Sequence, residues 1–266
     1  MQDLKVSIVQ TYLHWENVDA NLRHFTEKLN AIKEETDLIV LPEMFTTGFA
    51  VEREKVAEEH GGKGLQWMQQ KAKEKNCVIT GSIAVKENEE LSNRLYWVKP
   101  DGTYQFYNKR HLFKMAGEHK HFTAGEEKII VELKGWKICP LICYDLRFPV
   151  WSRNKWNKET NTADYDVLLY VANWPEVRSY PWKQLLIARA IENQSYLIGV
   201  NRIGEDGNKF SHSGDSAVIN PRGEIMSKIN AHEDTVETIM LSQSYLEEFR
   251  KVFPVGSDAD DFTLGS

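Results

Sequence analysis

The stretch ICPLICYDLRFP, residues 138–149, decides the fold that we expect for this chain. Its first half is apolar and typical of a buried strand, and the strand ends in a turn at Cys143. The backbone N–H of Tyr144 follows directly. Because covalent catalysis needs a nucleophile close to donors that can bind an oxyanion, Cys143 is a candidate nucleophile. The alternative is a small buried hydrophobic residue, as most free cysteines are.

Strand patterns alternate with helical patterns on both sides of this stretch, and this alternation favours an α/β fold with two sheets in contact and helices outside. Apolar residues recur at steps of four and three from Val18 to Ile32, which predicts an amphipathic helix. We expect strands at 4–9, 38–41, 78–85, 95–98, 103–108, 129–133, 136–143, 167–171, 196–200, 216–219, 224–229 and 235–241, with further helices around 65–72 and at 180–193.

Composition narrows the class of protein. The 266 residues are 41% hydrophobic, enough for a substantial core, and no linker or repeat divides them, so we expect a single domain over residues 1–266. A net charge of -6 without basic clusters argues against nucleic acid as a partner. The apolar runs are too short to span a bilayer. We therefore expect a cytoplasmic protein with no membrane partner.

Three strand ends carry side chains with complementary chemistry. Glu43 follows the strand at 38–41, Lys109 follows the strand at 103–108, and Cys143 ends the strand at 136–143. Binding and catalytic groups gather at strand ends in α/β sheets. Each residue alone is ordinary, since most glutamates and lysines lie on the surface. Together they supply a base, a cation and a thiol.

Glu43, Lys109 and Cys143 each lie in a motif that is similar to a motif of one known family, and the three motifs occur in the same order. VLPEMFTTGF (40–49), YNKRHLF (107–113) and LICYDLRFP (141–149) resemble the nitrilase superfamily of carbon-nitrogen hydrolases. Further segments are similar to its omega-amidase branch. The resemblance implies an αββα sandwich of two mixed sheets with helices on the outer faces. The similar segments are 114–126, 139–154, 172–178, 188–194 and 212–224.

The resemblance also implies roles for the residues in the motifs. Cys143 is the expected nucleophile and Glu43 the expected general base and acid. Lys109 and the backbone N–H of Tyr144 are expected to stabilise the oxyanion, and Glu118 matches an additional active-site glutamate. A thiol close to a cation should have a depressed pKa. The implied reaction hydrolyses the terminal amide of 2-oxoglutaramate or 2-oxosuccinamate through a thioester, with no metal and no other cofactor.

Recognition of such a substrate requires a group that binds its carboxylate. Arg147 is a candidate because a guanidinium group matches a carboxylate in bidentate fashion. A structural ion pair beneath the nucleophile turn is the competing interpretation. Trp174 is a candidate wall of the pocket, although a core or interface position explains it equally well.

Several alternatives stay open on the sequence alone. N-carbamoyl amidohydrolases and nitrilases of the superfamily use the same Glu-Lys-Cys triad. A metal-dependent phosphoesterase can also use a two-sheet α/β sandwich, and a non-catalytic scaffold is a third possibility. The resemblance further implies a homodimer, with the C-terminal segment at about 242–266 in its interface.

Overall fold

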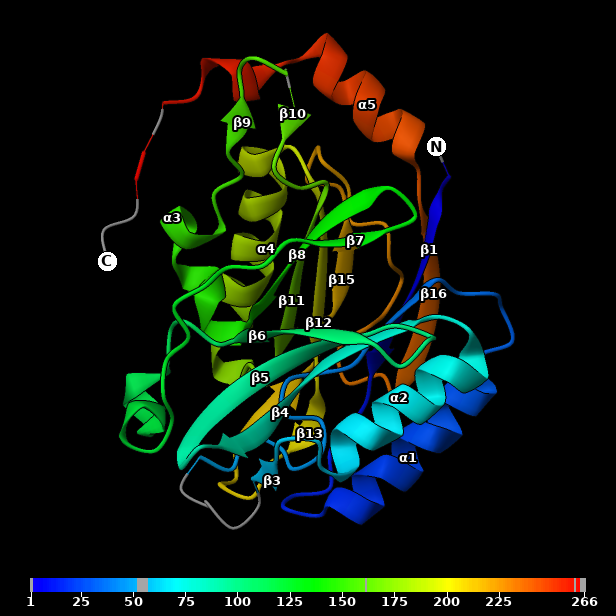
Figure 1. The fold of residues 1–266 in the computed structure, drawn as a ribbon, viewed down its shortest axis with the longest axis vertical. Coiled ribbons are helices and arrows are strands. Elements are labelled where there is room, and N and C mark those ends of the chain that lie inside the picture. The colour runs from blue at the N-terminus through cyan, green and yellow to red at the C-terminus, as the bar shows by residue number, and fades with distance from the viewer. Residues whose placement is uncertain (1, 52–56, 161, 261, 264–266) are drawn as a thin grey trace.

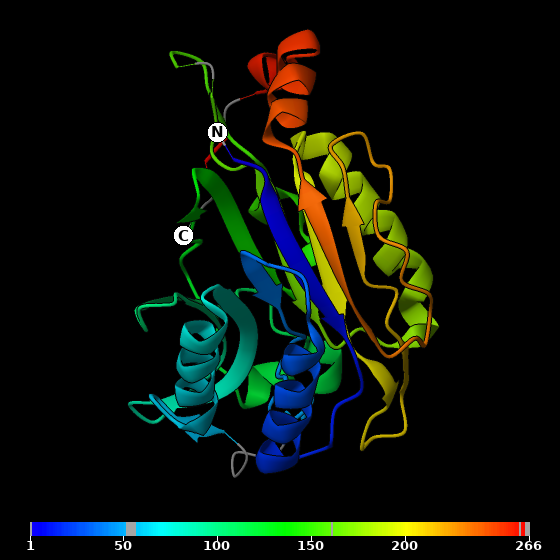
Figure 2. The same ribbon diagram turned by 90° about the vertical axis from the view of Figure 1, so that its right-hand side faces the viewer.

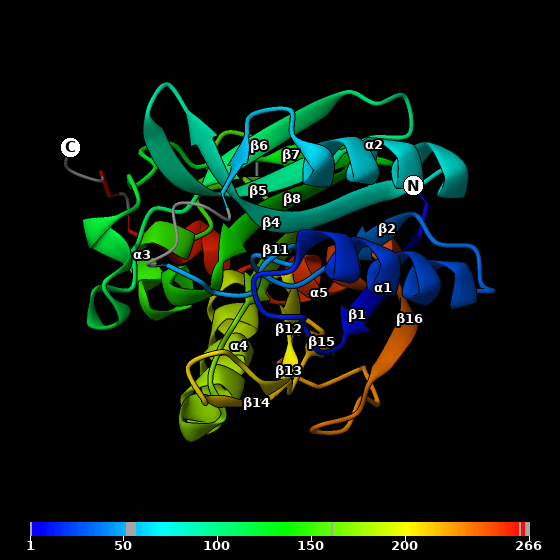
Figure 3. The same ribbon diagram turned by 90° about the horizontal axis from the view of Figure 1, so that it is seen from below.

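A computed structural model describes residues 2–51, 57–160, 162–260 and 262–263 of the chain. Two β-sheets pack face to face with helices outside them (Figures 1 and 2). Helices α1 and α2 cover one outer face, and α4 covers the opposite one (Figure 3). The expected αββα sandwich of two mixed sheets is therefore confirmed. The helices are α1 Val18–Ala31, α2 Lys63–Lys75, α3 Pro149–Ser152, α4 Ser179–Asn193 and α5 Gln243–Val252.

The first sheet has seven strands in the described residues, and its main path runs in the order β16-β1-β2-β4-β5-β6, with β3 paired to β4. Strands β1, β2 and β4 are parallel, whereas β16, β5 and β6 join antiparallel. Its strands are β1 Leu4–Gln10, β2 Leu38–Val40, β3 Glu58–Glu59, β4 Val78–Glu87, β5 Glu90–Val98, β6 Tyr104–Asn108 and β16 Thr235–Leu241.

The second sheet has five strands in the order β15-β12-β11-β8-β7. Its centre is parallel, because β11 pairs in parallel with both β8 and β12. These strands are β7 Val131–Leu133, β8 Trp136–Ile142, β11 Val167–Ala172, β12 Tyr196–Asn201 and β15 Ala217–Ile219. Two short hairpins stand apart from it, β9 Trp156–Asn157 with β10 Thr162–Ala163, and β13 Ile203–Glu205 with β14 Ser211–Ser213.

The main core lies between the sheets. Val6 and Leu95 of the first sheet belong to the same buried cluster as Leu141 and Leu169 of the second. Burial on both faces explains why the strands of the second sheet are continuous apolar runs rather than alternating patterns. Gly199 has no side chain that would separate β12 from Leu186 of α4, so this helix packs closely on the sheet.

One expected strand is wrong. Residues 224–229 form no strand and make only the isolated bridge between Ile219 and Ile225. Side chains bond backbone N–H groups that a strand would use to pair with its neighbour. The Glu237 carboxylate accepts the Lys228 N–H at 2.8 Å, and Asn220 Oδ1 accepts the Glu224 N–H at 3.1 Å. The other expected strands and helices are present with shifted ends, whereas α5 was not predicted.

Candidate active site

Glu43 lies in the loop after β2 and is completely buried. Its Oε1 accepts hydrogen bonds from Lys109 Nζ at 2.9 Å and from Asn93 Nδ2 at 2.8 Å. Its Oε2 accepts the backbone N–H of Asn173 at 2.7 Å, and the Asn173 side-chain amide bonds the Glu43 carbonyl oxygen. Both sheets therefore hold this carboxylate in place, the first through Asn93 and the second through Asn173.

Lys109 follows the last residue of β6 and is also completely buried. Its backbone N–H donates to Asn93 O at 2.9 Å, and its carbonyl oxygen accepts from Gly125 N–H at 2.9 Å. Gly125 packs directly on the Asn108 carbonyl group, where any β-carbon would clash. These contacts fix the backbone of Lys109. The position from which its side chain reaches the site is therefore set by β5 and by the loop at 117–125.

Glu118 is completely buried and begins the short 3₁₀ turn Glu118–Lys120. Its Oε1 and Oε2 accept hydrogen bonds from Lys109 Nζ at 3.1 and 3.0 Å. Oε2 also accepts the Phe113 backbone N–H at 2.6 Å. Glu118 is therefore not a solvated surface carboxylate, and the structure brings it to the same ammonium group as Glu43.

Cys143 stands where β8 ends and a 3₁₀ turn, Cys143–Arg147, begins. Its φ of 42° lies in the left-handed region, which costs a residue other than glycine about 1–3 kcal/mol. Val171 pairs with Ile142, so β11 and β8 end side by side and Asn173 emerges beside the thiol. Glu43 and the Asn173 N–H both lie close enough to the thiol to shift its pKa.

Burial and charge set the protonation states in this site. Burial alone would lower the pKa of Lys109, but the charges of Glu118 and Glu43 outweigh it and raise that pKa. Burial raises the pKa of Glu118, against the opposing charge of Lys109. Burial, followed by the Glu43 carboxylate, raises the pKa of the Cys143 thiol well above its ordinary value, although Lys109 opposes this. The expected depressed thiol pKa is wrong, because sequence spacing reveals the cation but not the burial.

The turn after Cys143 is fixed by Asp145, which is completely buried. Its Oδ2 accepts the Ile142 N–H at 3.0 Å and the Tyr107 hydroxyl at 2.8 Å. Its Oδ1 accepts the His111 backbone N–H at 3.0 Å and contacts His111 Nδ1 at 2.8 Å. Since Tyr107 and His111 flank Lys109 in the chain, Asp145 ties the turn that carries the thiol to the segment that carries the ammonium group.

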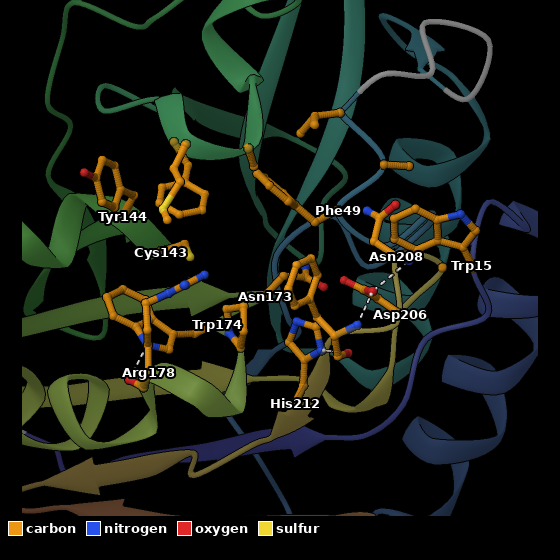
Figure 4. Close-up of a pocket in the computed structure, with 18 of the residues that line it drawn as sticks. Trp15, Phe49, Cys143, Tyr144, Asn173, Trp174, Arg178, Asp206, Asn208 and His212 are labelled. Atoms are coloured by element: carbon orange, nitrogen blue, oxygen red, sulfur yellow. Dashed lines mark hydrogen bonds between the residues drawn. The ribbon is translucent and has the colours of Figure 1, made fainter.

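A cavity of about 530 Å³ opens onto Cys143 and Lys109. Tyr144, Trp174 and Arg178 lie around the cysteine, whereas Trp15, Asp206 and Asn208 lie at the other end (Figure 4). Tyr144 is the second residue of the 3₁₀ turn. At the start of a helical turn the backbone N–H groups have no partner within the turn. The cavity therefore offers an acyl substrate a thiol, an ammonium group and a helical N-terminus.

Both candidate substrate-binding residues line this cavity. The guanidinium carbon of Arg147 lies 4.9 Å from the centroid of the Trp174 ring. Among the residues that the structure describes, no carboxylate pairs with Arg147. The competing interpretation of Arg147 as part of a structural ion pair therefore has no support in these residues. Trp174 is buried and packs against Trp182 of α4 at 5.4 Å between ring centroids.

Asn93, Asn173 and Asp145, which hold the candidate catalytic groups, were not predicted from the sequence. Asn173 directly follows an apolar strand, and that position is the one available signal. Asn93 lies inside β5, where a polar residue suggests only a solvent-facing position. Its contact with Glu43 depends on strand register.

Comparisons with known proteins agree with this geometry. A family model described as carbon-nitrogen hydrolase matches residues 5–251. The omega-amidase YafV of Escherichia coli K12 is 50% identical, over 99% of this chain and all of that protein. The 2-oxoglutaramate amidase of Bacillus subtilis 168 is 34% identical, over 95% of this chain and 96% of that protein.

Solved structures give the same result. XC1258 of Xanthomonas campestris is 42% identical, covers the whole of both chains and superposes with a TM-score of 0.97. It is described as a CN-hydrolase superfamily protein with an arsenic adduct in the active site. In the present structure, no helix among the described residues is long and apolar enough to cross a membrane.

Proposed function

We infer, from the premise that this chain belongs to the carbon-nitrogen hydrolase family of the nitrilase superfamily, that it is an omega-amidase. It hydrolyses the terminal amide of a small 2-oxo acid, such as 2-oxoglutaramate or 2-oxosuccinamate, to the dicarboxylate and ammonia. The observation that carries this proposal is the convergence of Glu43, Lys109 and Cys143 at the end of a cavity that also contains Arg147.

The first half-reaction forms a thioester. The Cys143 thiol is protonated in the empty site because its pKa is raised, so attack on the amide carbonyl requires proton transfer to Glu43 at the same time. The carbonyl oxygen becomes an oxyanion, which the Tyr144 N–H and the charge of Lys109 stabilise. Each well-placed donor contributes about 3–4 kcal/mol in comparable sites. Glu43 then passes the proton to the nitrogen, the carbon-nitrogen bond breaks and ammonia leaves.

The second half-reaction regenerates the enzyme. Glu43 is ionised again and takes a proton from a water molecule, while the oxygen of that water molecule attacks the thioester carbon. The carbon-sulfur bond breaks, the thiolate recovers the proton from Glu43, and the new carboxylic acid leaves. Lys109 stays charged throughout, because Glu43 and Glu118 raise its pKa. The role of Glu118 is to keep a negative charge beside Lys109 while Glu43 is protonated.

Arg147 binds the carboxylate at the far end of the substrate, and Trp174 forms the wall behind it. Stacking on the indole face restrains the guanidinium group, so less conformational entropy is lost on binding. Arg147→Lys should raise KM for 2-oxoglutaramate and leave a neutral amide unaffected, because lysine keeps the charge but loses the planar fork. Equal effects on both substrates would contradict this role.

The experiment that tests the reaction is ammonia release from 2-oxoglutaramate, glutamine, an N-carbamoyl amino acid and a nitrile, with Cys143→Ala as the inactive control. We expect the highest kcat/KM for 2-oxoglutaramate. Preference for the N-carbamoyl acid or the nitrile would replace the omega-amidase assignment by one of those two activities.

We also propose that residues 1–266 form a single domain and that the protein is a homodimer with about 242–266 in the interface. Residues 261 and 264–266 of that segment lie outside the described residues. Val252 and Phe253 of this segment are 70% and 58% exposed, and such apolar surface is typical of subunit contacts. Light scattering on the purified protein tests the proposal: a dimer mass is expected, and a monomer mass at micromolar concentration would contradict it.

A further inference from the structure

Arg178 is a second arginine at the cysteine end of the cavity, and its backbone is held rigidly. It ends the 3₁₀ turn Glu176–Arg178 and precedes α4. Its N–H donates to Pro175 O at 2.9 Å, and its carbonyl oxygen accepts the Trp174 indole N–H at 2.7 Å. Figure 4 shows this bond and places Arg178 on the same side of the cavity as Cys143.

The guanidinium group of Arg178 has no polar partner among the residues that the structure describes, and its carbon lies 5.3 Å from the Phe113 ring centroid. Arg250 shows the contrasting case. Its guanidinium group donates to Asp166 at 2.6 Å, to Tyr165 O at 2.8 Å and to Gln194 O at 2.9 Å. The donors of Arg250 are satisfied within the fold, whereas Arg178 lines the cavity with no such partner among the described residues.

Trp174 connects Arg178 to Arg147. Its ring face carries the Arg147 guanidinium group, and its indole N–H bonds the Arg178 carbonyl oxygen. The 15-residue helix α4 begins directly after Arg178, so the partial positive charge of its N-terminus lies next to the backbone of that residue. Among the residues that the structure describes, two acidic ones line the cavity, Glu16 and Asp206. Both come from other elements, and Asp206 Oδ1 already accepts the N–H groups of Asn208 and Phe210.

We propose that Arg178 is a specificity-determining residue that binds the substrate carboxylate jointly with Arg147. The two guanidinium groups, that of Arg147 over the Trp174 ring and that of Arg178 over the Phe113 ring, select amides that carry an anionic group and discriminate against neutral ones. This inference rests on the proposed function, because it takes the acyl substrate to lie between Cys143 and the arginines.

The test compares ammonia release from 2-oxoglutaramate and from pentanamide, a neutral amide of the same chain length. Arg178→Gln should raise KM for 2-oxoglutaramate about 10-fold or more, since a charge-assisted hydrogen bond is lost, and should change kcat/KM for pentanamide by less than about 2-fold. Arg178→Lys should recover part of the loss for the acid. In Arg147→Gln/Arg178→Gln, the combined loss should fall short of the product of the single losses, because both residues bind one carboxylate.

Arg222→Gln is the matched control, because this exposed arginine also stacks on aromatic rings, those of Tyr245 and Phe249, away from the cavity. It should leave both substrates unaffected. The proposal is overturned if Arg178→Gln impairs the two amides equally or impairs neither.

An N-carbamoyl amino acid in the same assay separates this inference from the proposed function. If the wild-type protein prefers that acid, the omega-amidase assignment fails. The effect of Arg178→Gln on that acid, compared with pentanamide, then still decides whether Arg178 binds a carboxylate.

Discussion

The two charged regions of this cavity are built in opposite ways. In the buried cluster, formed by Glu43, Lys109 and Glu118, each carboxylate oxygen accepts at least one hydrogen bond and no side chain is exposed. In the arginine wall, formed by Arg147 and Arg178, the guanidinium groups are partly exposed and contact aromatic rings instead of carboxylates. The buried cluster has its counter-charges within the fold, whereas the arginine wall has no carboxylate partner in the part of the chain that the structure describes.

This difference follows from what each region does. Stabilising a transition state requires charges that need no rearrangement, so their partners are supplied by the folded chain itself. Recognition requires groups whose partner arrives with the ligand, because an arginine already paired with a protein carboxylate must first break that pair. Variants in the cluster should therefore change kcat, and variants in the wall should change KM.

The largest effect is expected for Cys143→Ala. Removal of the nucleophile eliminates the thioester route, so kcat should fall at least about 10⁴-fold while the empty cluster keeps its ion pairs. The variant should still bind 2-oxoglutaramate through the arginine wall, which calorimetry can measure. Binding that disappears together with the thiol would contradict the separation of the two regions.

Glu118→Gln tests whether the second carboxylate of the cluster is needed. The ammonium group of Lys109 would lose one of its two counter-charges and would face an amide N–H group, so kcat should fall about 10²-fold with little change in KM. Glu126→Gln, at an exposed glutamate of the same segment, is the control. An unchanged kcat in Glu118→Gln would contradict the role of Glu118 as a counter-charge to Lys109 and would leave it only a packing role.

Asp145→Asn separates positioning from chemistry. Asparagine cannot accept the four donors that surround this carboxylate, so the turn at Cys143 should shift relative to Lys109 and kcat should fall about 10-fold. KM should change little, because the arginine wall is untouched. Asp166→Asn is the matched control, since it breaks the pair with Arg250 far from the thiol and should lower Tm without lowering kcat. A change confined to KM would contradict the positioning role of Asp145.

The sequence predicts the location of the candidate catalytic groups better than their environment. Glu43, Lys109 and Cys143 could be found because each follows a strand whose pattern is legible. Asn93 could not, because its contact with Glu43 depends on the antiparallel register that sets Asn93 of β5 opposite Ala84 of β4. The strand expected at 224–229 failed for a similar reason, since the Glu237 side chain that takes its donor comes from another strand.

The protonation states were equally inaccessible from the motifs. A lysine and a thiol in two motifs suggest a thiolate, but complete burial and a carboxylate beside the thiol reverse that expectation. Arg178 was not predicted as a site residue, because an arginine that lines a cavity and one on the open surface look alike in sequence. Its position in the cavity distinguishes it from Arg222, which also stacks on aromatic rings.

The smallest effect concerns His212, a buried residue that lines the cavity. Burial, with the charge of Arg202, lowers its pKa from 6.5 to about 4. Because the folded pKa lies below the unfolded one, the unfolded chain binds a proton before the folded chain does. The free energy of unfolding is therefore undiminished above pH 6.5 and falls as pH falls toward 4.

Between pH 7 and 5 the wild-type protein should lose about 1–2 kcal/mol more unfolding free energy than His212→Gln. Urea unfolding at the two pH values measures this difference, with His119→Gln, at an exposed histidine, as control. Equal losses in wild type and His212→Gln would mean that folding does not lower the pKa of this imidazole, which would then be charged at pH 5 in the same cavity as Lys109 and the arginine wall.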